Sequence, residues 1–315
     1  MEVVAVDKSL YTQHVHQRAG LFHTADFAAF NAAKVEAVHY LLFKDSRFRL
    51  GLILGSSGTE ARSPFSAPFG GFSPIQEEVK AAVVNDALHA LEKWLSKHGY
   101  RKITMVLPAL YYDGRFLTRM INGLFVSRYR SEQIDLNHHM ELPANFDQNY
   151  PRMLQKNARK NLKNALKQDF RWQKLPLSEA KRAYEVIAVN RKVRQKPLRM
   201  SLEQVLETSE RFSADFFVVE YQQTDVAAAI VFPVTARIVQ VIYWGDNPSF
   251  SDRRPMNFLT YKLFEYYANQ SIYLIDIGTS TENSVPNYGL CEFKESIGCS
   301  VSLKYTFSKE VSVCN

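Results

Sequence analysis

The sequence predicts an α/β (α+β) fold in two domains, each with a mixed, mostly antiparallel sheet flanked by helices. The chain has 315 residues, more than the roughly 100–200 residues of one typical domain. Apolar runs of strand length alternate along it with segments whose apolar residues recur at helical spacing. The second half predicts three helices, three strands and then helix, strand, helix, strand, and the first half predicts a shortened version of this order. We therefore expect an N-terminal domain over residues 1–148 and a C-terminal domain over residues 149–315.

The N-terminal domain is expected to begin with a hairpin. Residues 38–43 and 48–54 are apolar runs of strand length, separated by a short polar turn. Two prolines and a Gly-Gly pair in SPFSAPFGGF, residues 63–72, predict an irregular loop. A long helix is expected after this loop, with Ser73 as its N-cap and Pro74 at its first position. The other elements expected in this half are a strand over 102–107, a helix over 116–125 and an extended segment over 128–142.

The C-terminal domain is expected to begin with helices. Pro151 predicts the start of a helix over residues 151–167, and Ser178 and Ser201 predict the N-caps of two more helices. Gly298 predicts the end of a short helix that begins at residue 288. The remaining elements expected are strands over 216–221, 226–232 and 238–244, a helix over 257–269, and strands over 273–277 and 300–307.

The positive charge is concentrated in one segment. Between Arg152 and Arg199 there are 15 Lys and Arg residues and three acidic residues, a net charge of +12. The whole chain carries +7, and +7 minus +12 leaves −5 for the rest of it. Such a segment attracts phosphate-rich partners, but it is equally consistent with a solvated helix face whose partners are acidic residues elsewhere.

Several classes of protein do not fit the sequence. No apolar run approaches the ~20 residues of a membrane helix, and the N-terminus lacks the basic and apolar segments of a signal peptide. The odd number of cysteines, Cys291, Cys299 and Cys314, does not suit a disulfide framework. There is no C-x-x-C pair and every histidine precedes residue 140, which argues against a metal site. We expect a cytoplasmic protein with no metal and no tightly bound cofactor.

Three segments resemble those of FemAB-like proteins of the GNAT acyltransferase superfamily. The basic run RKNLKNALK, residues 159–167, resembles the helix that opens their second domain. The run DIGTSTENSVPNYGLCEFKESIGC, residues 276–299, resembles their C-terminal pattern, in which a strand ending in D-x-G precedes a Gly-Leu-x-x-Phe-Lys-x-x-x-Gly helix. The loop SPFSAPFGGF resembles a Pro- and Gly-rich loop in the first domain of related bacterial proteins. The helix pattern falls here on Gly289, Leu290, Phe293, Lys294 and Gly298.

The resemblance implies two GNAT-like domains and the transfer of an acyl or aminoacyl group onto an amine. The donor would be acyl-CoA or aminoacyl-tRNA, used as a co-substrate, and the acceptor a small molecule or a peptide. In the FemAB branch the acceptor is a cell-wall peptide precursor. GNAT enzymes commonly hold the CoA pyrophosphate on a glycine-rich loop at a helix N-terminus. The corresponding run GDNPSFSDRRPMNFLTYKLF lacks that glycine pattern. The side chains of Arg253 and Arg254 are therefore the candidate phosphate ligands, and a tRNA donor stays open beside CoA.

Lys294 is the first catalytic candidate, because the Phe-Lys position of FemAB-like proteins lies near the reacting groups. Acyl transfer builds negative charge on a carbonyl oxygen, and one fixed donor stabilises it by on the order of 3–4 kcal/mol. The alternative is a surface lysine on a helix. If Lys294 is catalytic, we expect Lys294→Ala to lower turnover far more than stability. Glu282 and Asp276 are candidate general bases, and Tyr288 is a candidate general acid. Asp276 has a second interpretation, as the cap of the loop after its strand.

The donor is expected beside the third strand of the C-terminal domain. Tyr243 and Trp244 end that strand, and an aromatic ring there stacks on a ligand or, more often, belongs to the core. The histidines His138 and His139 are adjacent on a predicted strand and face opposite sides. We expect both histidines to be structural or exposed.

Two groups of residues are candidates for binding the acceptor or its phosphates. Phe69, Gly70 and Gly71 lie in the Pro- and Gly-rich loop, where glycine lets the backbone approach a ligand closely or form a turn. The phosphates of tRNA or of a nucleotide-linked acceptor are expected to bind the basic helix. The residues expected to bind them there are Lys156, Arg159 and Lys160.

Three functions remain open from the sequence. The first is a FemAB-like transferase that uses acyl-CoA or aminoacyl-tRNA. The second is an ordinary GNAT N-acetyltransferase acting on a small molecule. The third is a non-catalytic protein that binds phosphate-containing ligands or RNA, because a fold does not fix a function.

Overall fold

The computed structural model describes residues 1–15 and 20–312 of the chain. The chain divides into two compact units: the first comprises Met1–Leu136, Glu282–Val285 and Ser302–Asn315, and the second comprises Asn137–Thr281 and Pro286–Val301. The sequence predicts one boundary after residue 148, whereas the contacts divide the chain inside the long strand β7 (Arg130–Glu141). The last strand, β15 (Ser300–Glu310), joins the first unit because it pairs with β6 (Lys102–Val106).

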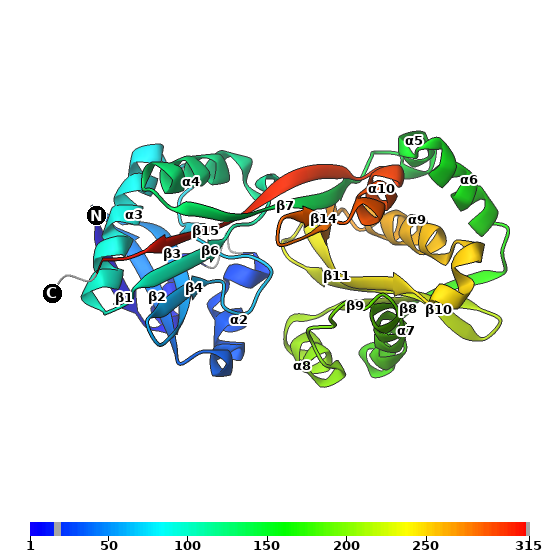
Figure 1. Ribbon diagram of the computed structural model, residues 1–315, viewed down its shortest axis with the longest axis horizontal. Coiled ribbons are helices and arrows are strands. Elements are labelled where there is room, and N and C mark those ends of the chain that lie inside the picture. Colours follow the sequence, from blue (N-terminus) through cyan, green and yellow to red (C-terminus); the bar gives the residue numbers. More distant parts are fainter. Residues whose placement is uncertain (16–19, 313–315) are drawn as a thin grey trace. The chain divides into compact units, whose positions relative to one another are not determined.

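The first unit is built on a sheet with the strand order β1-β2-β3-β4-β6-β15 (Figure 1). Neighbouring strands pair antiparallel, except β4 and β6, which pair parallel. Its other strands are β1 (Glu2–Val6), β2 (Ala37–Lys44), β3 (Phe48–Ser57), β4 (Glu60–Ser63) and the short β5 (Ser73–Pro74). Its helices are α1 (Lys8–Val15), α2 (Ala25–Phe30), α3 (Ala81–Lys97) and α4 (Gly114–Val126), with 3-10 turns η1 (Leu21–His23), η2 (Ala32–Lys34) and η3 (Leu110–Tyr112).

Helices cover both faces of this first sheet. Successive side chains of a strand point to opposite faces. Leu41 and Phe43 of β2 pack in one core with Leu88 of α3 and Met120 of α4, and Leu42 packs in another core with Tyr11 of α1. The continuous apolar run of β2 therefore has the composition of a strand that is buried on both sides.

The second unit is built on a sheet with the strand order β7-β12-β11-β10-β9-β8. Strands β11 and β12 pair parallel, and the other neighbours pair antiparallel. Its strands are β7, β8 (Phe170–Leu175), β9 (Asp215–Tyr221), β10 (Thr224–Pro233), β11 (Ile238–Asp246) and β12 (Leu274–Thr279). A separate two-stranded ladder pairs β13 (Thr281–Glu282) with β14 (Val285–Pro286). Its helices are α5 (Phe146–Met153), α6 (Lys156–Ala165), α7 (Ala180–Val193), α8 (Leu202–Phe212), α9 (Pro255–Ala268) and α10 (Tyr288–Ser296), with 3-10 turns η4 (Leu177–Glu179) and η5 (Pro248–Arg253).

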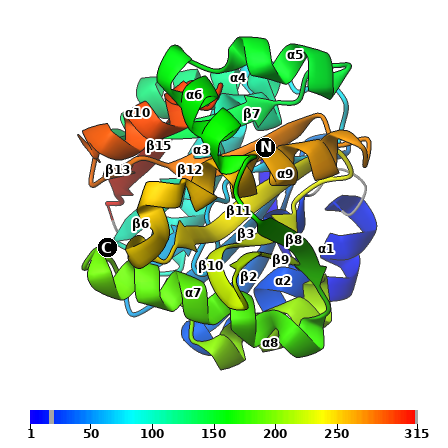
Figure 2. The same ribbon diagram turned by 90° about the vertical axis from the view of Figure 1, so that its right-hand side faces the viewer.

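Helices α7 and α9 cover opposite faces of the second sheet (Figures 1 and 2). Ala227 and Ala229 of β10 share a core with Leu259 of α9. Helix α7 packs on the other face, where a Cβ atom added to Gly245 of β11 would lie 2.7 Å from Cγ of Asn190. The absence of a side chain at Gly245 therefore lets α7 approach the end of β11 closely.

Most elements that apolar spacing predicts are present. The hairpin β2–β3, strand β6, helix α4, strands β9 to β12 and helices α9 and α10 all lie within a few residues of their expected bounds. Helix α8 begins where the sequence predicts. Ser201 accepts a hydrogen bond from the N–H of Gln204, and the Gln204 side chain accepts one from the N–H of Ser201.

Two predictions about proline were wrong. Ser73 and Pro74 do not start the long helix: they form β5, which is held extended by pairing with Leu50 and Gly51 of β3, and α3 begins only at Ala81. Pro151 lies inside α5 instead of opening a helix, and the chain is extended at Leu154 before α6 begins. In both places tertiary contacts of neighbouring residues decide the local structure.

Two further differences concern the basic segment. The N-cap of α7 is Glu179, because Ser178 lies in the preceding turn η4. Strand β8, Phe170–Leu175, was not predicted, since Lys174 breaks the alternation that Phe170 and Trp172 begin, and the stretch is highly charged.

The described part of the chain bears on two of the exclusions. Cys291 and Cys299 are free and buried, and Cys314 lies outside the described residues. Within residues 1–15 and 20–312, no helix has the length and apolarity needed to cross a bilayer.

The capping box of α8 gives a test of this fold. We expect Ser201→Ala to lower the free energy of unfolding by about 1 kcal/mol, because it removes the side-chain acceptor for the N–H of Gln204. Urea titration followed by circular dichroism measures the change. Ser178→Ala is the matched control and should be close to neutral, since Ser178 caps no helix. Equal losses in the two variants would contradict the assignment.

Candidate functional site

Strands β11 and β12 part in the middle of the second sheet. Their parallel pairing covers residues 238–240 and 274–276, although β11 continues to Asp246 and β12 to Thr279. Beyond Gln240 and Asp276, the facing backbone groups of the two strands have no ladder partner on that side. Because unpaired backbone groups seek hydrogen bonds, this opening is a place where a ligand can pair with the edge of β11.

Lys294 holds the end of β12 at this opening. Its side chain is 2% exposed, and its Nζ atom donates to the carbonyl oxygens of Ile277, Gly278 and Thr279 at 3.1, 2.9 and 3.1 Å. Burial lowers the pKa of Lys294 from 10.5 to about 8. The alternative of a surface lysine is therefore excluded: Lys294 is a buried cation that ties α10 to three successive carbonyl groups.

Asp276 is the polar anchor of the same strand. Its carboxylate accepts hydrogen bonds from Nδ2 of Asn137 at 2.8 Å, from Nε2 of Gln240 at 2.9 Å and from the N–H of Gly278 at 2.8 Å. The side chain is buried, and both carboxylate oxygens are used. This geometry supports the capping interpretation of Asp276, since its carboxylate is buried and accepts from the N–H of Gly278, two residues further along the chain.

The two histidines of β7 are buried. His138 lies between Oγ of Ser280, 3.0 Å from its Nδ1 atom, and Oε1 of Glu295, 3.5 Å from its Nε2 atom. Burial lowers the pKa of both His138 and His139, so that both favour the neutral form. Burial also raises the pKa of Cys299 to about 12, which keeps this neighbouring thiol protonated and unreactive near neutral pH.

Tyr243 and Trp244 lie on opposite faces of β11. The hydroxyl of Tyr243 accepts a hydrogen bond from the N–H of Met200 at 3.3 Å, on the side of α7. Trp244 contacts Phe293 of α10 with ring centroids 6.1 Å apart, on the side of α9. One strand therefore presents the two candidate donor-binding residues to different surroundings.

The two arginines before α9 differ in the contacts that their side chains make. Arg253 donates to Oε1 of Gln168 at 3.1 Å and lies 4.7 Å above the ring of Tyr221, whereas Arg254 is exposed. Pro255 has no N–H, and the N–H groups of Asn257 and Phe258 bond to the carbonyl of Arg254. The helix N-terminus therefore offers little backbone to a pyrophosphate, and Arg254 is its available cation.

Glu282 and Tyr288 are both exposed, Glu282 in β13 and Tyr288 at the start of α10. Tyr288 is 73% exposed. Neither side chain shares the burial of Lys294. Their catalytic roles stay predictions.

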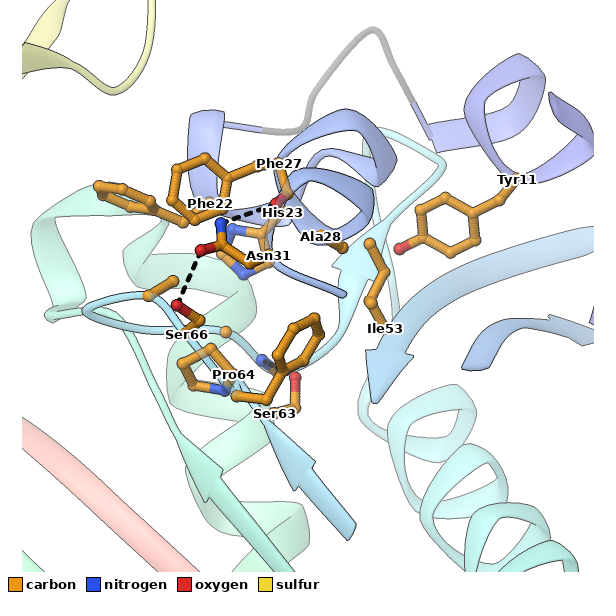
Figure 3. Close-up of a pocket in the computed structure, with 14 residues that line it drawn as sticks. Tyr11, Phe22, His23, Phe27, Ala28, Asn31, Ile53, Ser63, Pro64 and Ser66 are labelled. Atoms are coloured by element: carbon orange, nitrogen blue, oxygen red, sulfur yellow. Dashed lines mark hydrogen bonds between the residues drawn. The ribbon is translucent and has the colours of Figure 1, made fainter. Parts of the chain in front are cut away.

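The Pro- and Gly-rich loop of the first unit is packed down. Phe69 is buried, with its ring centroid 5.2 Å from that of Phe22 and 4.7 Å from that of Tyr112. Figure 3 shows the loop residues Ser63, Pro64 and Ser66 facing Phe22 and Asn31. The cavity between them is also lined by Gly70 and Gly71.

This loop leaves little room for a ligand. The cavity has about 20 Å³ of free volume, which is about one water molecule. The N–H of Gly70 donates to the carbonyl of Val106 at 2.8 Å, just beyond the point where β4 and β6 stop pairing. The loop therefore fills, in the first sheet, the position that is open between β11 and β12 in the second.

The basic helix α6 carries both free and engaged cations. Arg159 donates to the carbonyl oxygens of Pro151 and Leu154 at 2.9 and 3.1 Å and so caps the end of α5. Lys156 and Lys160 are exposed. Neither has an acidic partner within 4.0 Å among residues 1–15 and 20–312, and no Asp or Glu occurs over residues 148–168.

Sequence reasoning missed Gln240, Asn137 and Arg191 as site residues. Gln240 and Asn137 hold Asp276, and Arg191 of α7 places its guanidinium 6.0 Å from the ring centroid of Tyr243. The sequence contains no signal for the first two, because they meet Asp276 only through strand pairing. Arg191 was counted in the basic segment but is not an exposed member of it.

The fold, in contrast to the sequence, has clear relatives. No family model and no curated protein matches the chain. FemX matches with a TM-score of 0.72 at 11% identity, over 98% of this chain and 97% of that chain. A tandem GNAT protein from the clavulanic acid biosynthesis pathway matches with a TM-score of 0.56 at 11% identity, over 100% and 99%. L-PGS from Bacillus licheniformis matches with a TM-score of 0.56 at 12% identity, over 96% and 91%. The FemAB-like, tandem GNAT resemblance is thereby confirmed for the fold.

The buried Lys294 gives a test of this site by stability. Lys294→Met leaves three carbonyl groups without their donor, and we expect it to lower the free energy of unfolding by about 2–4 kcal/mol. From the sequence we expected replacement of Lys294 to affect mainly turnover; the three hydrogen bonds predict a clear loss of stability as well. Lys262→Met removes a surface ion pair with Glu265 and should cost less than about 1 kcal/mol.

The same pair of proteins gives a test by pH. The folded state holds Lys294 at a pKa of about 8 and the unfolded state at the ordinary 10.5, so between these values the unfolded chain binds more protons. The stability contributed by Lys294 therefore rises with pH over this range. Urea unfolding is measured at about pH 7.5 and about pH 9.5, roughly half a unit below and roughly 1.5 units above the folded pKa. The difference in the free energy of unfolding between wild type and Lys294→Met should be larger at the higher pH. A gap that narrows would overturn the burial argument.

Proposed function

We propose that the second unit is an acyltransferase site, which moves an acyl or aminoacyl group from acyl-CoA or aminoacyl-tRNA to an amine. The observation that carries this proposal is the parting of β11 and β12 beyond Gln240 and Asp276, with the buried cation of Lys294 at its edge. In the GNAT fold the donor lies beside the strand equivalent to β11. The likeness of fold to FemX and to a tandem GNAT protein supports the same site here.

The chemistry needs no covalent intermediate with the protein. The neutral amine of the acceptor attacks the carbonyl carbon of the donor, the new C–N bond forms, and the carbonyl electrons move to oxygen. Collapse of this tetrahedral intermediate breaks the C–S bond of a thioester or the C–O bond of an aminoacyl ester. The amine loses one proton to a base and the leaving group gains one, which gives an amide and either CoA thiol or free tRNA.

The residues of the site would serve this reaction by position and charge. The unpaired edge of β11 offers backbone donors to the acyl carbonyl, and Lys294 supplies a positive charge where the oxyanion develops. All three donated bonds of Lys294 go to carbonyl groups, so it acts on the oxyanion through its field and through the shape it gives β12. Glu282 as a base and Tyr288 as an acid are proposed from the resemblance alone.

The residues that could bind phosphate bear on whether the donor is acyl-CoA or aminoacyl-tRNA. The N-terminus of α9 has Arg254 but few free N–H groups, which weakens the case for CoA. The exposed, unpaired lysines of α6 favour a polyphosphate partner, and tRNA is such a partner. We propose a peptide amine, such as that of a cell-wall precursor, as the acceptor, with a small-molecule amine as the alternative. The same lysines keep a non-catalytic RNA-binding protein as the second candidate function.

A parallel binding and transfer experiment tests the proposal. A ligand at about a hundred times its Kd stabilises the folded state by roughly 2.7 kcal/mol, which raises the thermal midpoint measurably. We expect such a shift with either acetyl-CoA or charged tRNA, and formation of an amide by mass spectrometry when a primary amine is added. A Lys294→Gln variant that binds the donor fully and forms no amide would support catalysis. Binding of tRNA without any transfer by wild type would favour the RNA-binding candidate.

The lysines of α6 give a separate prediction about tRNA. The double variant Lys156→Gln, Lys160→Gln should weaken tRNA binding and reduce the slope of log Kobs against log salt by about 2, one unit for each lost phosphate contact. Fluorescence anisotropy at several salt concentrations measures the slope. Lys181→Gln is the control, because Lys181 lies on α7 with Glu185 3.6 Å away. An unchanged slope in the double variant would remove α6 from the interface.

A further inference from the structure

Three arginines lie on α7 or at its end, and two of them have acidic partners. Arg182 donates to both carboxylate oxygens of Asp225 at 2.9 Å and to Glu179 at 2.8 Å. Arg194 lies 3.6 Å from Asp246, whose backbone and side chain also accept from Nδ2 of Asn190. Asp246 is therefore engaged by the residues on either side of Arg191.

Arg191 itself has no acceptor. Its Nε atom is buried and has no hydrogen-bond partner among the described residues, and no carboxylate oxygen of those residues lies within 4.0 Å of its guanidinium. The guanidinium carbon lies 6.0 Å from the ring centroid of Tyr243, and the positive charge of Arg191 is near enough to Lys294 to help lower the pKa of that lysine. The residue is half-buried, so its charge is partly removed from water without compensation.

A half-buried arginine without a hydrogen-bond acceptor destabilises the folded protein unless a bound anion supplies the acceptor. Desolvation of a cation disfavours its charged form, and burial lowers the pKa of Arg191 accordingly. Arg182, on the same helix, shows how this chain pairs an arginine with carboxylates of its own. The planar guanidinium fits a carboxylate or phosphate with two parallel hydrogen bonds, so an oxyanion is the group that would complete it.

The surroundings of Arg191 are fixed in a way that suits binding. Tyr243 is held by the N–H of Met200, so the ring beside the guanidinium keeps its orientation. Asn190 holds α7 to the end of β11 at 2.8 Å from the carbonyl of Asp246. The site lies on the face of the sheet opposite α9 and its N-terminal Arg254 (Figures 1 and 2). An anion at Arg191 would therefore be distinct from a donor phosphate at α9.

We infer that Arg191, backed by the ring of Tyr243, is a binding site for an oxyanion carried by a substrate, a carboxylate or a phosphate that reaches the second sheet from the α7 side. The statement that the anion belongs to a substrate rests on the proposed function; the anion site itself does not. In the transfer reaction the donor phosphates would lie at α9, and the anionic group of the acceptor would lie at Arg191 and orient the acceptor. Arg191 would therefore be a determinant of acceptor specificity.

The inference is tested by titrating the full chain with two simple anions in the absence of any acyl donor. Sodium acetate and inorganic phosphate are added at constant ionic strength while the arginine Nε–Hε signals are followed by NMR. We expect one signal, absent in Arg191→Lys, to shift in a saturable manner, and the anion with the lower Kd identifies carboxylate or phosphate. Arg191→Gln should weaken binding of that anion, followed in this variant by backbone amide signals, at least about tenfold, as expected for loss of a charge-assisted bidentate pair.

Matched variants separate a local site from general electrostatics. Arg194→Gln removes the same charge three residues away and should leave the Kd within about twofold, because the Arg194 side chain is 60% exposed and already faces Asp246. No saturable shift with either anion, or equal weakening in Arg194→Gln, would overturn the inference. If Arg191→Gln fails to fold, Arg191→Lys keeps the test, since it retains the charge but loses the bidentate geometry. Anion binding without transfer would count against the proposed function alone, and transfer with an unchanged acceptor KM in Arg191→Gln would count against the substrate assignment alone.

Discussion

The buried ammonium group of Lys294 is the interaction on which the second unit depends. Three successive carbonyl groups at the end of β12 turn toward one Nζ atom, so they are not available to pair with β11. Asp276, just before them, is held by Asn137 from β7 and Gln240 from β11, which keeps the paired part of the strands in register. A charged group inside a protein is tolerated only when its hydrogen bonds are satisfied, and backbone oxygens do that here. The opening beside β11 begins where these carbonyl groups turn to Lys294, and β11 has an irregularity at the same place, between Val241 and Tyr243 in its pairing with β10.

The two units use the same arrangement of strands with different results. Each sheet has a parallel pair, β4 with β6 in the first and β11 with β12 in the second, among antiparallel neighbours. In the first unit the Pro- and Gly-rich loop returns to the end of the pair, where Gly70 donates to Val106 and Phe69 packs among aromatic rings. In the second unit no such loop follows β11, and the cation of Lys294 occupies the end of its partner strand. The physical difference is that one opening is filled by the chain's own backbone and the other is left with unpaired groups.

Charge is distributed over the second unit by pairing as much as by sequence. The basic segment gives α6 its exposed lysines, yet Arg159 in the middle of it is used to cap α5, and Arg182 is used to join α7 to β10. What remains unpaired differs in kind: Lys156 and Lys160 are hydrated and suited to a salt-sensitive contact, whereas Arg191 is half-buried and suited to one oxyanion. A polyphosphate surface and a single anion site can therefore coexist within one run of basic residues.

The sequence by itself determined the order of most elements, because periodic burial of apolar side chains is a local property of strands such as β10 and helices such as α9. It also located Lys294 and the basic helix, since both lie in contiguous patterns. It did not determine that Lys294 is buried, that Asp276 accepts three hydrogen bonds, that Phe69 is buried or that Nε of Arg191 lacks a hydrogen-bond partner. It also misplaced the start of α3 and the role of Pro151, because β-pairing and packing overrode local signals there. Burial and pairing are set by segments far apart in the chain that meet only in the folded sheet, so only the tertiary structure decided which polar groups are satisfied and which are left for a ligand.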